Sequence, residues 1–348
     1  MTGRPAWACP DDGAPLERAT PGLLCPRCGK EVPARDGVAR FSAADRGRGR
    51  LLDELLAGAE RETTEEAARR LCAGRRYHRR RFTTDWKFLL PLPRGARVLE
   101  IGAGFGDDTL ELARAATAVH SLVPDDRGGA LVARRLREHG IGNVAVGVVG
   151  DLSGIPLPAG SIDAIALEDV AAPGFGLTPR TLPAAAAEFA RLLAPAGSIL
   201  VGSRNSYRAL PALRALLPPG TLESLNRAVK RDAGRGAGRL PPALVTRRLR
   251  EAGFDGPQAY APIPHEQRIE AVVPLEDPAA LRYCLDRFLR RNSLVTGAGV
   301  AVARVAAALG LLPILLPYRF LLFRRAVPAG AASVQPMCSM RSTIRSHE

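Results

Sequence analysis

Lysine is nearly absent from this 348-residue chain, which contains only Lys30, Lys87 and Lys230. The other 46 of its 49 basic residues are arginines, and with 35 acidic residues the net charge is +14. An excess of basic over acidic residues can indicate a nucleic-acid or anionic-membrane partner. These arginines are spread along the chain, however, which favours a coding bias over a selected cationic surface.

Long uncharged apolar runs are also missing. Residues 295–323 are mostly apolar, but two arginines and two prolines interrupt them. A membrane span needs about 20 largely uncharged residues, so we expect no transmembrane span. A packed helix with a final strand at 318–323 is one interpretation, and interfacial contact with a membrane is the other. The first residues lack the apolar core of a secretory signal, so we expect a cytoplasmic protein.

Disorder and small disulfide scaffolds are excluded by composition. Apolar residues make up 46% and charged residues 24%, which is typical of a globular chain with a sizeable core. The length fits one large domain or two modest ones, at about 100–200 residues each. Six cysteines are present, and three of them fall within the first thirty residues. In a reducing compartment, this crowding favours a metal site over disulfides.

Two similar turns carry these three cysteines. They read Cys9-Pro10-Asp11-Asp12-Gly13 and Cys25-Pro26-Arg27-Cys28-Gly29. Structural zinc takes four ligands in a tetrahedron, and Asp12 stands where a fourth cysteine would normally be. We therefore predict a zinc-ribbon-like unit over residues 1–42 with Cys9, Asp12, Cys25 and Cys28 as metal ligands. A ribbon that has lost its metal and transient redox chemistry of the thiols are the alternatives.

Short apolar runs alternate with helical stretches from residue 88 to about residue 203. Such alternation predicts βαβ units on a parallel sheet with helices on both faces. The expected strands are 96–101, 119–123, 144–149, 162–167 and 198–201, and the expected helices include 108–116, 128–139, 184–194 and 243–252. Around them we expect a helical linker at 43–87, a lid or insertion at 204–242 and a flexible tail at 326–348.

A glycine loop, Glu100-Ile101-Gly102-Ala103-Gly104-Phe105-Gly106, lies between the first of these strands and the first helix. Glycines there let the backbone turn sharply and approach a ligand closely. A dinucleotide loop would read G-x-G-x-x-G and place a pyrophosphate at the helix N-terminus. Here Asp107 and Asp108 occupy that place and would repel a pyrophosphate. A zwitterionic ligand with an amino group fits better, and a purely structural turn is the alternative.

Four blocks in order and spacing resemble the class I S-adenosylmethionine-dependent methyltransferases. They lie at 98–106, 149–152, 157–163 and 192–198. The resemblance implies an α/β, Rossmann-like, seven-stranded methyltransferase sheet in a domain that spans 88–325. It also implies cofactor-binding roles: Gly102, Gly104 and Gly106 beside the methionine part, Glu100 at the loop or amino group, Asp151 at the adenine amine and Leu152 on the ring.

One position departs from the family pattern. The second strand of these enzymes usually ends in an acidic residue that binds both ribose hydroxyls, and here it ends in Val123. An apolar side chain cannot accept those hydroxyl protons. Asp125 or Asp126 could substitute from the following loop. The alternative is a non-catalytic binding module with a degenerate cofactor site.

Two residues are candidates for catalysis. Methyl transfer is an in-line displacement, so the enzyme positions the acceptor and removes its proton where needed. Glu168 follows the fourth strand, and His265 has an ordinary pKa near neutrality. A helix-capping role for Glu168 and a solvated loop position for His265 are the structural alternatives.

The acceptor is less well defined than the cofactor. Residues 84–91, 249–254 and 273–278 loosely resemble methyltransferases of surface-polysaccharide assembly, which implies a sugar or lipid-linked glycan as the small-molecule acceptor. Zinc ribbons also precede some ribosomal RNA methyltransferases, and basic runs at 75–81 and 230–239 could contact phosphates. The chain has neither an N-P-P-[YF] tetrapeptide nor a cysteine nucleophile in the catalytic stretch, so RNA is the second choice.

Overall fold

The computed structural model describes residues 5–42, 50–71, 84–170, 174–175, 177–204, 240–265, 268–291 and 318–326. The expected lid at 204–242 and the tail at 326–348 lie almost entirely outside these ranges, as do the basic runs at 75–81 and 230–239. Among the described residues, no helix is both long and apolar enough to cross a membrane.

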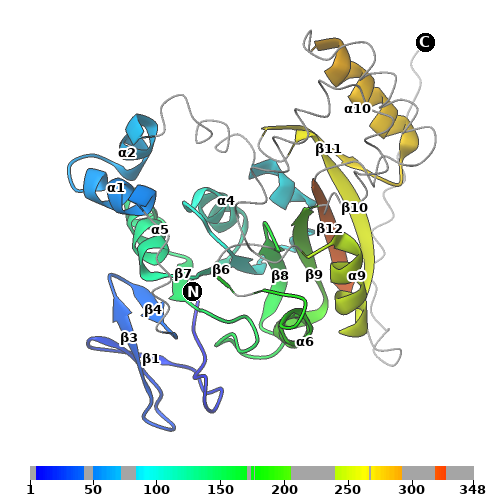
Figure 1. The fold of residues 1–348 in the computed structure, drawn as a ribbon. Helices are drawn as coiled ribbons and strands as arrows, with labels where there is room; N and C mark the ends of the chain where they lie inside the picture. The colour runs from blue at the N-terminus through cyan, green and yellow to red at the C-terminus, as the bar shows by residue number, and fades with distance from the viewer. Residues whose placement is uncertain are drawn as a thin grey trace, which may run out of the picture.

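Eight strands form the central sheet (Figure 1). Five of them run parallel, in the spatial order β7-β6-β5-β8-β9. Next to β9 lies β12, which is antiparallel to β9, followed by β10 and the outer strand β11. The bounds are β5 (Arg97–Ile101), β6 (Ala118–Val123), β7 (Val144–Val148), β8 (Ile162–Leu167), β9 (Leu193–Arg204), β10 (Phe254–His265), β11 (Arg268–Pro274) and β12 (Tyr318–Arg325).

Helices cover both faces of this sheet, as the sequence predicts. Successive side chains of β5 point to opposite faces of the sheet. Val98 packs with α4 and with the short 3-10 helix η1, whereas Leu99 and Ile101 share a core with α6 and α9. A further helix, α5, lies over β6 and β7. The bounds are η1 (Thr84–Leu89), α4 (Asp107–Ala115), α5 (Asp126–Glu138), α6 (Leu182–Leu192), α9 (Pro242–Glu251) and α10 (Pro278–Arg291).

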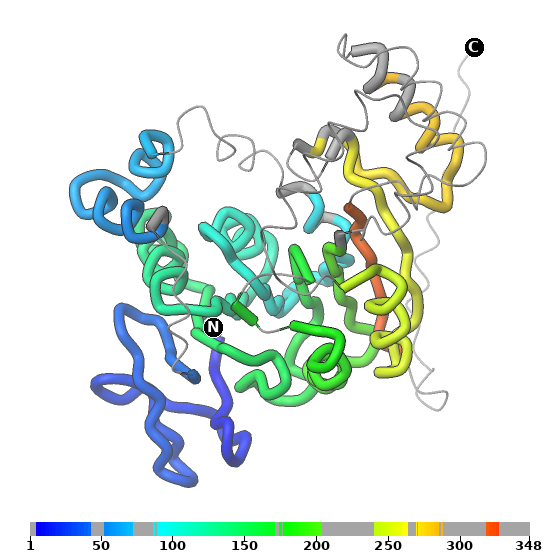
Figure 2. Tube along the Cα trace, in the orientation of Figure 1, coloured from blue at the N-terminus to red at the C-terminus, as the bar shows by residue number. Residues whose placement is uncertain are grey.

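The N-terminal unit continues the central sheet. Its strands are β1 (Glu17–Ala19), β2 (Gly22–Leu24), β3 (Glu31–Arg35) and β4 (Val38–Arg40), and β4 pairs in parallel with β7. The sheet therefore has twelve strands rather than the seven that the family resemblance implies. The N-terminal segment, drawn in blue, lies beside the central strands (Figure 2). Trp7 fills the joint, because its ring stands against Gly147 of β7, where a Cβ would come within 2.8 Å.

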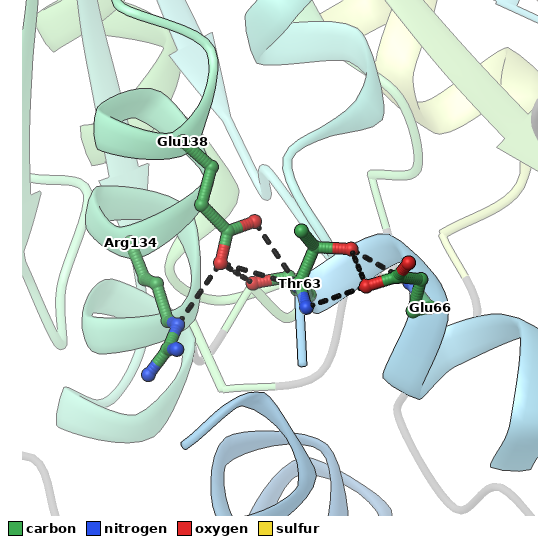
Figure 3. Close-up of polar contacts among 5 residues, drawn as sticks. Thr63, Glu66, Arg134 and Glu138 are labelled. Carbon is green, nitrogen blue, oxygen red and sulfur yellow. Dashed lines mark hydrogen bonds and ion pairs between the residues drawn. The ribbon is translucent and has the colours of Figure 1, made fainter. Parts of the chain in front are cut away.

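The expected helical linker contains a helical hairpin, α1 (Arg50–Ala59) and α2 (Thr64–Leu71). A capping box begins α2: Thr63 accepts from the Glu66 N–H, and Glu66 accepts from the Thr63 N–H at 2.9 Å. Figure 3 shows how Glu138 of α5 then accepts from both the N–H and the hydroxyl of Thr64. Together with packing of Leu55 on Leu131, these bonds fix the hairpin on α5.

Candidate cofactor site and metal cluster

The glycine loop lies at the carboxyl end of β5, where the chain order of the sheet reverses. β6 lies on one side of β5 and β8 on the other, and open α/β sheets bind ligands at this kind of switch point. Gly102, Gly104 and Gly106 all have positive φ, at 89°, 56° and 83°. Side chains are strained in that region, so the backbone itself requires glycine at the three positions that the sequence singles out.

Glu100 lies beneath this loop and is buried. Its Oε2 accepts hydrogen bonds from Thr109 at 2.6 Å and from Ser121 at 2.8 Å, whereas its Oε1 is buried without a partner among the described residues. Burial raises the pKa of Glu100 to about 7, with a smaller contribution from the nearby negative charge of Asp108. A carboxylate oxygen left without a donor at this depth is costly, and it can accept from a ligand ammonium.

Two buried cations neutralise the acidic residues that follow the loop. Arg135 donates to Asp107 at 2.7 Å, and Lys87 forms an ion pair with Asp108 at 2.9 Å. Both cations are almost fully buried, with side chains 5% and 2% exposed. The expected repulsion of a pyrophosphate is therefore weaker than the sequence suggests. Neither cation was predicted from the sequence, where the rarity of lysine was the one signal that could have pointed to Lys87.

The structure shows what surrounds the missing ribose acid. Val123 ends β6 and is buried, so this position is apolar in space as well as in sequence. Asp125 caps α5 by accepting from the Gly128 N–H at 2.8 Å, and its second carboxylate oxygen has no hydrogen bond to the described residues. Asp126 is paired with Arg40 of the N-terminal unit at 2.8 Å. Of the two substitutes that the sequence offered, Asp125 has the less committed carboxylate.

The two predicted adenine contacts, Asp151 and Leu152, differ in exposure. Asp151 is exposed, and its carboxylate accepts from the N–H and the hydroxyl of Ser153, both at 2.9 Å. Leu152 is closed to solvent within the main core, so its packing on a ring stays a prediction.

The two catalytic candidates lie on different strands of the same sheet edge. Glu168 directly follows β8, and its carbonyl accepts from the Tyr318 hydroxyl. His265 ends β10, opposite Arg268 of β11. β9 and β12 separate β8 from β10. The His265 side chain lies outside the described part of the chain, so both roles stay predictions.

The predicted metal ligands lie together in the N-terminal unit. The ligand atoms of Cys9, Asp12, Cys25 and Cys28 are all within 4.8 Å of one another. Each turn closes with the N–H of its glycine, Gly13 or Gly29, on the carbonyl of its first cysteine.

The chemistry of this cluster fits a structural cation. Desolvation opposes ionisation of Cys25, yet hydrogen bonds from the backbone N–H groups of Cys28 and Arg27 outweigh it and lower the pKa of this thiol. Three sulfurs and one carboxylate within reach of a common centre are donors that zinc accepts.

Comparison with known proteins identifies the central part of the chain. Residues 98–197 match the family model of a methyltransferase domain, and no curated protein matches. Similar solved structures include the [4+2]-cyclase SpnF, at 20% identity over 77% of this chain and 85% of that one with a TM-score of 0.42.

Two methyltransferases are also similar. A phosphoethanolamine N-methyltransferase 2 from Haemonchus contortus has 15% identity over 69% of this chain and 51% of its own, with a TM-score of 0.42. The geranyl diphosphate C-methyltransferase from Streptomyces coelicolor A3(2) has 17% identity, coverage of 70% and 75%, and a TM-score of 0.40. The chain carries a methyltransferase domain with the Rossmann-like class I fold.

Proposed function

We propose that this chain binds S-adenosylmethionine at the loop after β5 and transfers a methyl group to an oxygen or nitrogen of a small-molecule acceptor. The observation that supports this most strongly is the glycine loop, with three positive φ angles at the switch point of a methyltransferase domain. The buried, unpartnered Oε1 of Glu100 beneath it suits the ammonium of an amino-acid group.

The residues of the chain would mainly bind and orient. When bound, the cofactor supplies a methyl group on a sulfonium centre. The residues around the loop would align the acceptor with that methyl group. Asp151 would accept from the adenine amine, and the second oxygen of Asp125 would accept from a ribose hydroxyl in place of the family acid. Glu168 or His265 would take the acceptor proton.

For the acceptor we favour a sugar or lipid-linked glycan, with RNA as the alternative. The support is the loose resemblance at 84–91, 249–254 and 273–278. Screening of sugars, lipid-linked glycans and RNA for methyl incorporation separates these classes. Incorporation into RNA alone would overturn this choice.

The proposed cofactor contacts are tested by calorimetry with S-adenosylhomocysteine. Asp151→Ala should weaken binding by about tenfold, the value of one good hydrogen bond. Asp125→Asn is sharper, because asparagine is as good a helix cap as aspartate but lacks the charge for the ribose. Unchanged binding by Asp125→Asn would remove this residue from the site. If both variants bind normally, the ligand lies elsewhere.

We propose further that Cys9, Asp12, Cys25 and Cys28 hold a structural zinc ion, as expected in a reducing cytoplasm. The shared spacing of the two turns and the closeness of the four ligand atoms support this. Elemental analysis of the purified chain should give one zinc per chain, and Cys28→Ser should lower it. A chain purified without metal, and unable to take up zinc, would contradict the proposal.

A further inference from the structure

A buried lysine stands next to the proposed cofactor loop. Lys87 lies on η1, and its side chain is 2% exposed. Burial of an ammonium costs several kcal/mol unless carboxylates compensate it, and the compensating partner here is Asp108 in the first turn of α4. In a chain that uses arginine almost everywhere else, a compact ammonium at this point is a specific choice, because a guanidinium needs a wider, planar space.

Lys87 also acts on Glu100. Its positive charge lowers the pKa of Glu100, against the larger effect of burial and the repulsion by Asp108. The charged groups that face Glu100 are therefore Asp108 from α4 and Lys87 from η1. The neighbouring strands contribute Ser121 from β6 and, from β8, Ala166, which has no charge. Asp108 directly precedes Thr109, which donates to Glu100 at 2.6 Å, so the ion pair between Lys87 and Asp108 stands beside the Glu100 carboxylate.

The position of Lys87 is fixed from outside the site. Trp86, the preceding residue, stacks on Phe320 of β12 with ring centroids 5.4 Å apart and planes at 7°. Both rings belong to the core that also contains Leu112 of α4. η1 is therefore held between β12 and α4, and its lysine pairs with Asp108 at the start of α4.

We propose that Lys87 is a positioning residue of the cofactor site, which offsets the negative charge of Asp108 beside Glu100 so that Oε1 of Glu100 can accept from the ammonium of the bound cofactor. This rests on the proposed function. Without Lys87 the two carboxylates repel each other, and Glu100 keeps its proton to a higher pH. A protonated Glu100 has no negative charge with which to bind an ammonium.

The test is the pH dependence of S-adenosylhomocysteine binding, measured by calorimetry from pH 5.5 to 9 together with melting temperatures. The wild type should bind more tightly as Glu100 ionises near neutral pH. Lys87→Met should weaken binding by about tenfold at pH 7 and move the midpoint of the pH profile up by about one unit. Lys87→Arg should restore part of the affinity. Arg94→Met, at an exposed cation between η1 and β5, is the control and should bind as the wild type does.

A merely structural role predicts a different pattern. Lys87→Met would then melt at a lower temperature but keep the wild-type midpoint, and that result would overturn the proposal. Should Lys87→Met fail to fold, carbon-13 labelling of the three lysines in the wild type decides: the Lys87 signal should shift when S-adenosylhomocysteine is added, and an unshifted signal refutes the proposal. A wild type that binds no S-adenosylhomocysteine refutes the proposed function instead.

Discussion

The N–H of Ala8 donates a 2.8 Å hydrogen bond to the carbonyl of Pro156. Ala8 immediately precedes the metal-ligand candidate Cys9, and Pro156 lies in the loop that follows Asp151. A second link joins Arg40 to Asp126, next to the cap of α5. The N-terminal unit thus touches both loops that we assign to the nucleoside side of the cofactor, so metal binding and cofactor binding should be coupled.

Removal of the metal should therefore weaken cofactor binding as well as stability. Chelation, or Cys28→Ser, should lower the melting temperature of the whole chain and weaken S-adenosylhomocysteine binding about fivefold or more, the usual lower range of such coupling. Calorimetry on loaded and chelated protein measures it, with Cys284→Ser of α10 as a control away from the cluster. Equal affinities in the two forms would show that the metal unit is energetically separate.

Glu100 should make the protein less stable as the pH rises from about 4.5 to 7. The unfolded chain releases this proton near the ordinary pKa of 4.5, whereas the folded chain keeps it up to about 7. The stabilisation is complete below pH 4.5 and is lost through pH 7, a change of about 3 kcal/mol. Urea unfolding of wild type and Glu100→Gln at several pH values measures this difference. If both lose the same free energy over this window, Glu100 is already ionised in the folded state.

His120 should act in the opposite direction on the acid side. Burial lowers its pKa to about 4 from 6.5, despite a hydrogen bond to the Ala6 carbonyl that raises it. The unfolded chain takes up a proton that the folded chain refuses, so stability falls as the pH drops from 6.5 to 4, by about 3 kcal/mol. Unfolding of His120→Gln should show a smaller acid loss than the wild type. His139→Gln, at an exposed histidine, is the control, and it should keep the full loss.

The joint between Trp7 and Gly147 should not tolerate a methyl group. A Cβ at Gly147 would come within 2.8 Å of the Trp7 ring, so Gly147→Ala should reduce the free energy of unfolding by about 1–3 kcal/mol. Trp7→Leu should recover part of that loss in the double variant. Gly142→Ala, where a Cβ meets nothing within 4 Å, should be nearly neutral. A neutral Gly147→Ala would mean that Trp7 moves aside easily.

Local patterns predicted the central elements well, and prolines account for some of the exceptions. The expected strands 119–123 and 162–167 correspond closely to β6 and β8. The prediction placed this strand at 198–201, because Pro195 and Gly197 suggest a loop. In the structure, β9 already begins at Leu193. Three prolines likewise obscure β10, which pairs with both β11 and β12. The two helices α1 and α2 lie within the expected helical linker at 43–87.

Contacts between residues far apart in the chain could not be predicted from the sequence. The pairing of β4 with β7 joins residues about 100 positions apart, and neither strand has a side-chain pattern that specifies its neighbour. The same holds for Lys87, whose partner Asp108 lies on a different element. By contrast, the closeness of the four metal-ligand candidates was predictable, because two short turns with fixed spacing each bring their own pair of candidates together; that they bind a metal stays a prediction.

Calorimetric titration of S-adenosylhomocysteine into the wild type, Gly104→Arg and Gly140→Arg tests the central claim most directly. Both glycines have positive φ, so both variants have similar backbone strain, but Gly140 lies beyond the end of α5 and away from the loop. We predict micromolar binding by the wild type and by Gly140→Arg, and none by Gly104→Arg. No binding by well-folded wild type, or binding that Gly104→Arg retains, would contradict a cofactor site at this loop.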